Sequence, residues 1–167
     1  MAIVAADIKE YRSTFSASGV DSLGGAITAT EVVDNTTHNI WDVVSSAESS
    51  AGDTEYRCIY VKNTHASLTL QSAKVWIQTQ TPSTDTSVEI GLGSSAVNGT
   101  EQTVANENTA PTSVTFSTAA NEAAALSIGN IPNGQHKAIW IKRIVGAAAV
   151  AANDDSYVLS YAGDTAA

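Results

Sequence analysis

The sequence has little charge for its length. Of its 167 residues, 15% are charged, against about 25% in an ordinary globular domain. Seventeen acidic residues outnumber 8 basic ones, which gives a net charge of −9. Binding to phosphate backbones needs clustered lysine and arginine, and the nearest approach to a cluster is Lys137, Lys142 and Arg143. Because neighbouring positions of a strand point to opposite faces, this group cannot form one basic patch, and we expect no nucleic-acid partner.

Cysteine and long apolar runs are also scarce. Cys58 is the only cysteine, so no disulfide can form within the chain, and its place in an apolar run predicts a buried structural thiol. No stretch reaches the roughly 18 apolar residues of a membrane span. Met1–Ala6 is too short an apolar run for a signal peptide, because Asp7 follows it. We expect no membrane partner and synthesis in a reducing cytoplasm.

Motifs that would carry catalysis or hold a cofactor are missing. The histidines, His38, His65 and His136, lack the spacing and the cysteine partners that favour a transition-metal site. Gly91 and Gly93 lack the third glycine and the following helix of a phosphate-binding loop. We therefore expect no enzyme and no cofactor, with no catalytic, cofactor-binding or metal-binding residues.

Paired acids do occur, at Asp154 and Asp155. Neighbouring acids on an exposed loop are ordinarily solvated turn residues, and we expect that role here. The alternative is a calcium site completed by Asn153 and Asp164, because a hard cation needs several converging oxygens.

The chain does have a clear β-strand pattern. Two long blocks, Thr54–Gln80 and Ala124–Val145, each read as two strands folded back on each other around a turn, Asn63–Ser67 in the first and Gly129–Gly134 in the second. Alternating β-branched and aromatic residues on both sides of a turn are typical of strands. Neither block contains a nucleophile or a ligand cluster, so we expect a β module that works through its surface.

The remaining segments divide the chain into an arm and a sandwich. Residues 1–25 are expected to form an extended N-terminal arm, and residues 26–167 one β-sandwich domain. Gly93–Pro111 is a polar loop of a length typical of binding loops. About eight short strands separated by turns predict an all-β fold, a jelly-roll or Ig-like antiparallel sandwich. The shorter expected strands are Ala26–Val33, Asn39–Val44, Val88–Leu92, Ser113–Ser117 and Ser156–Tyr161.

The few aromatic residues admit two interpretations. Trp41, Trp76 and Trp140, with the tyrosines, could form a platform on which sugar rings stack. All three tryptophans lie in apolar strand segments, so we expect core or interface packing instead.

Five stretches of the chain carry a family resemblance: Gly52–His65, Val88–Gly93, Gln102–Pro111, Ile128–Arg143 and Asn153–Asp155. They resemble virion structural proteins of tailed bacteriophages, in particular small β-rich capsid decoration (cement) proteins. The resemblance implies a dimer or trimer, made in the host bacterial cytoplasm. Such a protein binds the outer surface of the capsid and clamps adjacent major capsid subunits, so the expected partners are the major capsid protein and further copies of the chain.

We expect the arm Ala2–Gly25 and the loop Gly93–Pro111 to make the capsid contacts. Two alternatives remain from the sequence. One is a β module associated with the tail, baseplate or fibre, and the other is a carbohydrate-binding adhesion module.

Overall fold

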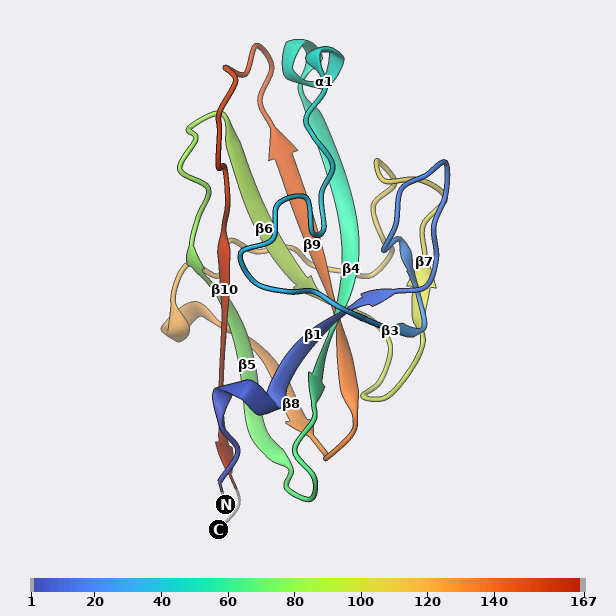
Figure 1. The fold of residues 1–167 in the computed structure, drawn as a ribbon, viewed down its shortest axis with the longest axis vertical. Coiled ribbons are helices and arrows are strands. Elements are labelled where there is room, and N and C mark those ends of the chain that lie inside the picture. Colours follow the sequence, from blue (N-terminus) through green and yellow to red (C-terminus); the bar gives the residue numbers. More distant parts are fainter. Residues whose placement is uncertain (1, 166–167) are drawn as a thin grey trace.

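A computed structural model describes residues 2–165, which fold into antiparallel sheets (Figure 1). A five-stranded sheet has the order β3-β1-β4-β9-β6, a three-stranded sheet has the order β10-β5-β8, and β2 pairs with β7. The strands of this range are β1 (Ile8–Ser13), β2 (Gly24–Gly25), β3 (Ile27–Glu31), β4 (Asp53–Asn63), β5 (Leu70–Thr79), β6 (Thr86–Leu92), β7 (Glu101–Thr103), β8 (Leu126–Ile131), β9 (His136–Val145) and β10 (Val158–Thr165). An apolar core joins the two larger sheets, and the expected all-β sandwich is confirmed.

The five-stranded sheet is covered on both faces. In β4, Ile59 packs into the core between the two larger sheets, whereas Cys58 and Tyr60 point into a second core under β2, β7 and their loops. The same division places Ile139 of β9 in the first core and Trp140 in the second. Strands buried on both faces have near-continuous apolar sequences, which explains the runs at residues 58–61 and 138–141. The buried Cys58 is as expected.

The two long sequence blocks do not fold back on themselves, and that expectation is wrong. β4 and β5 of the first block belong to different sheets, as do β8 and β9 of the second. The blocks instead pair with each other, β4 with β9 and β5 with β8. The side chain of Asn63 holds both crossings between the sheets, because its Nδ2 donates to the carbonyls of Leu68 at 2.8 Å and Ile131 at 2.9 Å.

Residues 2–25 do not form an extended arm. β1 lies inside the larger sheet, with β4 on one side and β3 on the other. This strand was not expected because it contains the charged residues Lys9 and Glu10. Both are only half-buried in the sheet; Lys9 forms an ion pair with Glu31, and Glu10 accepts a hydrogen bond from Tyr161. Residues 14–23 then leave the sheet and insert Leu23 into the second core. Met1 lies outside the described residues.

Two other expected strands are loops in the structure. Residues 39–44 have no strand structure; Ile40 and Trp41 pack against the first core from a loop. Residues 113–117 make only an isolated bridge between Ser117 and Ile90 of β6. The other strand segments listed from the sequence, Ala26–Val33, Val88–Leu92 and Ser156–Tyr161, overlap β3, β6 and β10.

Three short helical segments complete this range: α1 (Ser46–Ala51), η1 (Ala5–Asp7) and η2 (Glu122–Ala124). Ser45 and Glu48 form a reciprocal capping box at the start of α1. Within residues 2–165, no helix has the length and apolar character needed to cross a membrane.

Candidate functional site

A buried ionic cluster closes one end of the first core. Glu55 and Arg57 lie on β4, Arg143 lies on β9 opposite Glu55, and Asp42 and Glu107 come from loops. Arg143 Nε donates to Glu55 Oε2. Arg57 Nη2 lies 2.5 Å from Glu107 Oε2 and 3.3 Å from Asp42 Oδ1. We call these five residues the arginine cluster.

The centre of the arginine cluster is almost closed to solvent, whereas the side chain of Asp42 at its edge is 57% exposed. The side chains of Glu55 and Arg57 are 1% and 2% exposed. Buried charges are tolerated only when they are paired, and this cluster supplies opposite charges from four separate segments. Burial raises the pKa of the Glu55 carboxyl to about 7, although the charge of Arg143 opposes the shift.

Trp41 forms the lid of the arginine cluster. The guanidinium carbons of Arg57 and Arg143 lie 4.9 and 4.8 Å from the centre of its ring, the geometry of cation–π contacts. Its indole N–H donates to the hydroxyl of Tyr157 at 3.2 Å. Trp76 and Trp140 are 8% and 0% exposed. The tryptophans therefore serve packing, as expected: Trp41 is half-buried over the two arginines, and Trp76 and Trp140 lie in the two cores.

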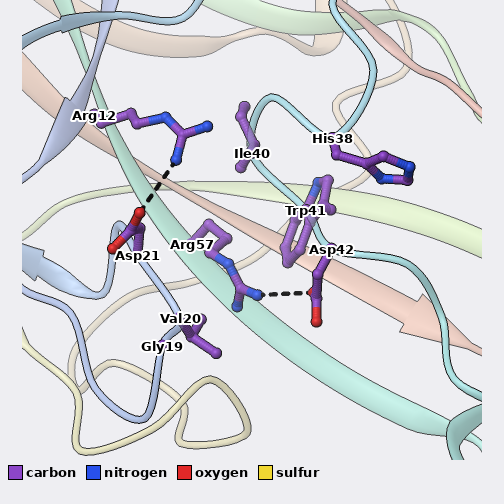
Figure 2. A pocket seen from close by; sticks show the side chains of 9 residues that line it. All are labelled: Arg12, Gly19, Val20, Asp21, His38, Ile40, Trp41, Asp42 and Arg57. Atoms are coloured by element: carbon purple, nitrogen blue, oxygen red, sulfur yellow. Dashed lines mark hydrogen bonds and ion pairs between the residues drawn. The ribbon is translucent and has the colours of Figure 1, made fainter.

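A cavity of about 210 Å³ opens beside the arginine cluster (Figure 2). Its lining consists of Arg12, Gly19, Val20, Asp21, His38, Ile40, Trp41, Asp42 and Arg57. Figure 2 shows Arg12 facing Asp21 on one side and Arg57 facing Asp42 on the other, with shortest separations of 3.6 and 3.3 Å. Among the described residues that line it there is no serine, threonine, cysteine or lysine, so this cavity offers no hydroxyl, thiol or amine nucleophile.

A wider groove of about 530 Å³ runs between β10 and the strands β1 and β3. Lys9 and Glu31 form an ion pair at its edge, with 2.9 Å between Nζ and Oε2. The hydroxyl of Tyr161 donates to Glu10, and burial raises the pKa of the Glu10 carboxyl against this hydrogen bond. Four of the polar side chains that line this groove are thus paired with each other.

The histidines lie in three separate places. His38 lines the smaller cavity. His65 holds the turn after β4, since its Nδ1 accepts from the N–H groups of Ser67 and Leu68. His136 packs edge-on against Tyr60, 4.9 Å between ring centres, and burial lowers its pKa.

Two groups of three carboxylates occur within residues 2–165, and Glu55 belongs to both. They are Asp42–Glu55–Glu107 and Glu48–Asp53–Glu55, each with ligand atoms within 4.8 Å of one another. Arg57 and Arg143 occupy the first group. Sequence reasoning missed the first group because its members are far apart in the chain, and the second because α1, which brings Glu48 to Asp53 and Glu55, was not expected. The visible signal was a pair of charged residues, Glu55 and Arg57, beside the apolar run at residues 58–61.

The acids that the sequence singled out lie elsewhere. Asp155 accepts hydrogen bonds from the backbone N–H of Ser83 at 3.1 Å and from the hydroxyl of Thr86. Asp154 is exposed and has φ +58°, a turn conformation. Asp154 is thus a solvated turn residue, as expected, whereas Asp155 is half-buried and joins its loop to the turn before β6.

The two segments expected to make contacts lie side by side. β2 pairs with β7, which brings residues 14–21 next to residues 105–110 (Figure 1). Beyond the end of β1, the carbonyls of Ser22 and Glu107 accept from the N–H groups of Cys58 and Tyr56 at 2.6 and 2.8 Å. The two segments therefore complete the edge of β4.

We call the exposed residues of these segments the loop face. They are Thr14, Phe15, Ser16, Ser18, Gly19, Asp21, Ala105, Asn106, Asn108, Thr109 and Ala110. Asp21 is the one charged member of this set, and Phe15 is a large apolar member, 38% exposed. Such a surface leaves little charge to desolvate on contact.

Side chains of β4 and β9 hold the segments beneath the loop face by hydrogen bonds. Tyr60 donates to the carbonyl of Gly25 and accepts from the N–H of Glu101 at 2.9 Å. Lys137 Nζ donates to the carbonyls of Gly93, at 2.8 Å, and Ser95. The first half of the expected binding loop is therefore anchored to the sheet through Gly93, Ser95 and Glu101, and Ser94, Ala96, Asn98 and Thr100 remain exposed in it.

Comparison of the chain with protein-family models, with curated proteins and with solved structures found no match.

Proposed function

We propose that this protein is a virion structural protein that binds the outer surface of a phage capsid and stabilises it by clamping adjacent major capsid subunits. The observation that carries the proposal is the loop face, which joins residues 14–21 and 105–110 into one nearly uncharged surface. The resemblance of residues 52–65 and 128–143 to decoration proteins supports the same function. Those residues include most of the central strands β4 and β9.

The physical properties suit a protein that adheres to an assembled shell. Desolvating a surface of small polar residues costs little free energy, and a rigid protein loses little conformational entropy on binding. A protein that binds only the assembled shell stabilises it by mass action. Self-association as a dimer or trimer adds avidity, because several weak contacts then act together.

Mixing the purified protein with undecorated capsids and imaging them by electron microscopy tests the proposal. Deletion of residues 2–25 is unsuitable, because it removes β1 from the sheet. The better variants are Ala105→Arg and Ala110→Arg, which place bulk and charge on the loop face. The matched control is Ala123→Arg, at another exposed alanine, in η2, which packs beside β5 of the other sheet.

We expect regular occupancy of the capsid by the wild type and by the control. Each loop-face variant is expected to bind about tenfold more weakly or worse, as for a contact at the centre of an interface. Failure of the wild type to bind capsids would overturn the proposal, and binding to tails instead would favour the tail-associated alternative. Equal occupancy by all variants would show that the loop face is not the contact.

A further inference from the structure

A second group of carboxylates lies at the outer end of the arginine cluster. Asp53 and Glu55 are alternate residues of β4, so their side chains leave the same face of the strand. Glu48 reaches them from α1, which turns into β4 through Gly52 at φ +79°. One carboxylate oxygen from each residue lies within 4.8 Å of the others. The local chain path thus makes the three carboxylates converge.

In each of these carboxylates, one oxygen is already held. Glu48 Oε2 accepts from the N–H of Ser45 at 2.6 Å. Asp53 Oδ1 accepts from its neighbour Thr54 at 2.8 Å and from Asn108 Nδ2 at 2.7 Å. Arg143 occupies Oε2 of the third carboxylate. The three side chains are therefore fixed in place, and each keeps a second oxygen for another partner.

The second oxygen of Glu55 is buried and has no hydrogen-bond partner among residues 2–165. The side chain is 1% exposed, and Oε1 makes only a long ion pair, at 3.9 Å, with Arg57 Nη2. A buried charged oxygen without a partner is costly. The missing hydrogen bond at this oxygen is an observation separate from the acidic character of the group, because the distant Arg57 leaves room for a closer cation or donor.

The carboxylates around Glu55 outnumber the cationic side chains, which also favours a bound cation. The two carboxylate groups together contain five acids, whereas two guanidiniums, those of Arg57 and Arg143, lie among them. The arginines pair mainly with Asp42, Glu107 and one oxygen of Glu55. Glu48 and Asp53 have no cationic side chain in an ion pair within the described part of the chain.

We propose that Glu48, Asp53 and Glu55 bind a divalent cation, and that Ca²⁺ is the ion the site prefers. Ca²⁺ takes oxygen ligands in flexible geometry and accepts several carboxylates, whereas Mg²⁺ demands a strict octahedron. Glu48 and Asp53 are half-exposed, so water completes the coordination shell. The bound ion ties α1 to β4 and neutralises the outer end of the arginine cluster. A site of this openness belongs to the weak class, with Kd of about 0.1–1 mM.

The test is calorimetric titration of Ca²⁺ into the full-length protein after treatment with EDTA, with thermal melting in parallel at matched ionic strength. The variants Glu48→Gln and Asp53→Asn each remove one charge and keep an oxygen for the existing hydrogen bonds. Gln also preserves the capping box at the start of α1. The control is Asp154→Asn, which changes the exposed acid of the rival calcium site around Asp154 and Asp155.

We expect one Ca²⁺ per chain and a melting temperature that rises with Ca²⁺ more than with Mg²⁺. Each of Glu48→Gln and Asp53→Asn is expected to weaken binding about tenfold or more, while Asp154→Asn binds as the wild type does. No heat of binding and no rise in melting temperature at about 5 mM Ca²⁺, well above the expected Kd, would overturn the proposal. Wild-type affinity in both folded site variants, or loss of binding in Asp154→Asn alone, would overturn it as well.

Discussion

Glu55 and Arg143 lie directly opposite each other on β4 and β9, and Arg143 Nε donates a hydrogen bond to Glu55 inside the sandwich. Farther along the same strands, Ile59 and Ile139 are opposite each other in the apolar core. One shared face is thus apolar in its middle and ionic at one end. The three-stranded sheet covers the apolar part, and Trp41 covers the ionic part.

Removal of Arg143 should therefore destabilise the fold. Arg143→Met leaves a buried carboxylate without its main partner, and we expect the free energy of unfolding to fall by about 3–5 kcal/mol. Chemical denaturation at pH 8, above the pKa of about 7 for Glu55, measures this. The double variant Glu55→Leu with Arg143→Met removes both charges and should recover most of the loss. Equal losses in the single and double variants would contradict an ionic role for the pair.

The hydroxyl of Tyr60 is expected to hold the loop face in place. Tyr60→Phe removes the bond to the carbonyl of Gly25 and leaves the N–H of Glu101 without an acceptor. We expect a loss of about 1–3 kcal/mol in the free energy of unfolding and faster hydrogen exchange at the β2–β7 pairing. The control is Tyr11→Phe, a half-buried tyrosine on the neighbouring strand. If both variants behave alike, the Tyr60 hydroxyl does not pin these segments.

The positions of most strands could be predicted from the sequence, but their partners could not. The alternating pattern of residues 54–62 is the same whether the next strand returns in a hairpin or crosses to another sheet. The crossing depends on Asn63, whose side-chain partners, Leu68 and Ile131, become neighbours only on folding. β1 was missed for a related reason, because the partners that satisfy Lys9 and Glu10 are distant in sequence.

The candidate site was less predictable than the fold. Glu55 and Arg57 are charged residues beside the apolar run of β4, but nothing in the neighbouring sequence indicates their partners. The contacts of Arg57 with Asp42 and Glu107 span 15 and 50 residues, and the contact between Glu55 and Arg143 spans 88. Such contacts depend on which strands are neighbours in the sheet and on the course of the loops. The alternation of apolar and polar residues along a strand does not specify either.

Acid should weaken the attachment of the loop after β6. Burial opposes ionisation of Glu101, but hydrogen bonds from Ser95 and Ser94 outweigh it and hold the pKa of the carboxyl at about 2. Because this pKa lies below the ordinary value of 4.5, the folded protein favours the carboxylate more than the unfolded chain does. The resulting stability is fully present above pH 4.5 and is lost as the pH falls toward 2.

The variant Glu101→Gln tests this dependence. We expect its free energy of unfolding, measured by urea titration, to be lower than that of the wild type at pH 7. The difference between the two proteins should decrease steadily as the pH falls from 4.5 to 2. Glu122→Gln, at an exposed acid paired with Lys74, serves as the control and should show no such narrowing. A stability gap for Glu101→Gln that does not change with pH would mean that lost packing, rather than lost charge, causes it.

The close approach of β2 to β7 should make Gly24 irreplaceable. Its φ of +95° already disfavours a side chain, and a Cβ atom there would lie 1.9 Å from the carbonyl oxygen of Gln102. Gly19 is the matched control, because its φ is +84° and nothing lies within 4 Å of its Cβ position. Both alanine variants carry backbone strain of about 1–3 kcal/mol, so any further loss in Gly24→Ala reports the clash. We expect Gly24→Ala to lose about 2 kcal/mol more than Gly19→Ala in the free energy of unfolding, and equal losses would show that the two strands can separate without cost.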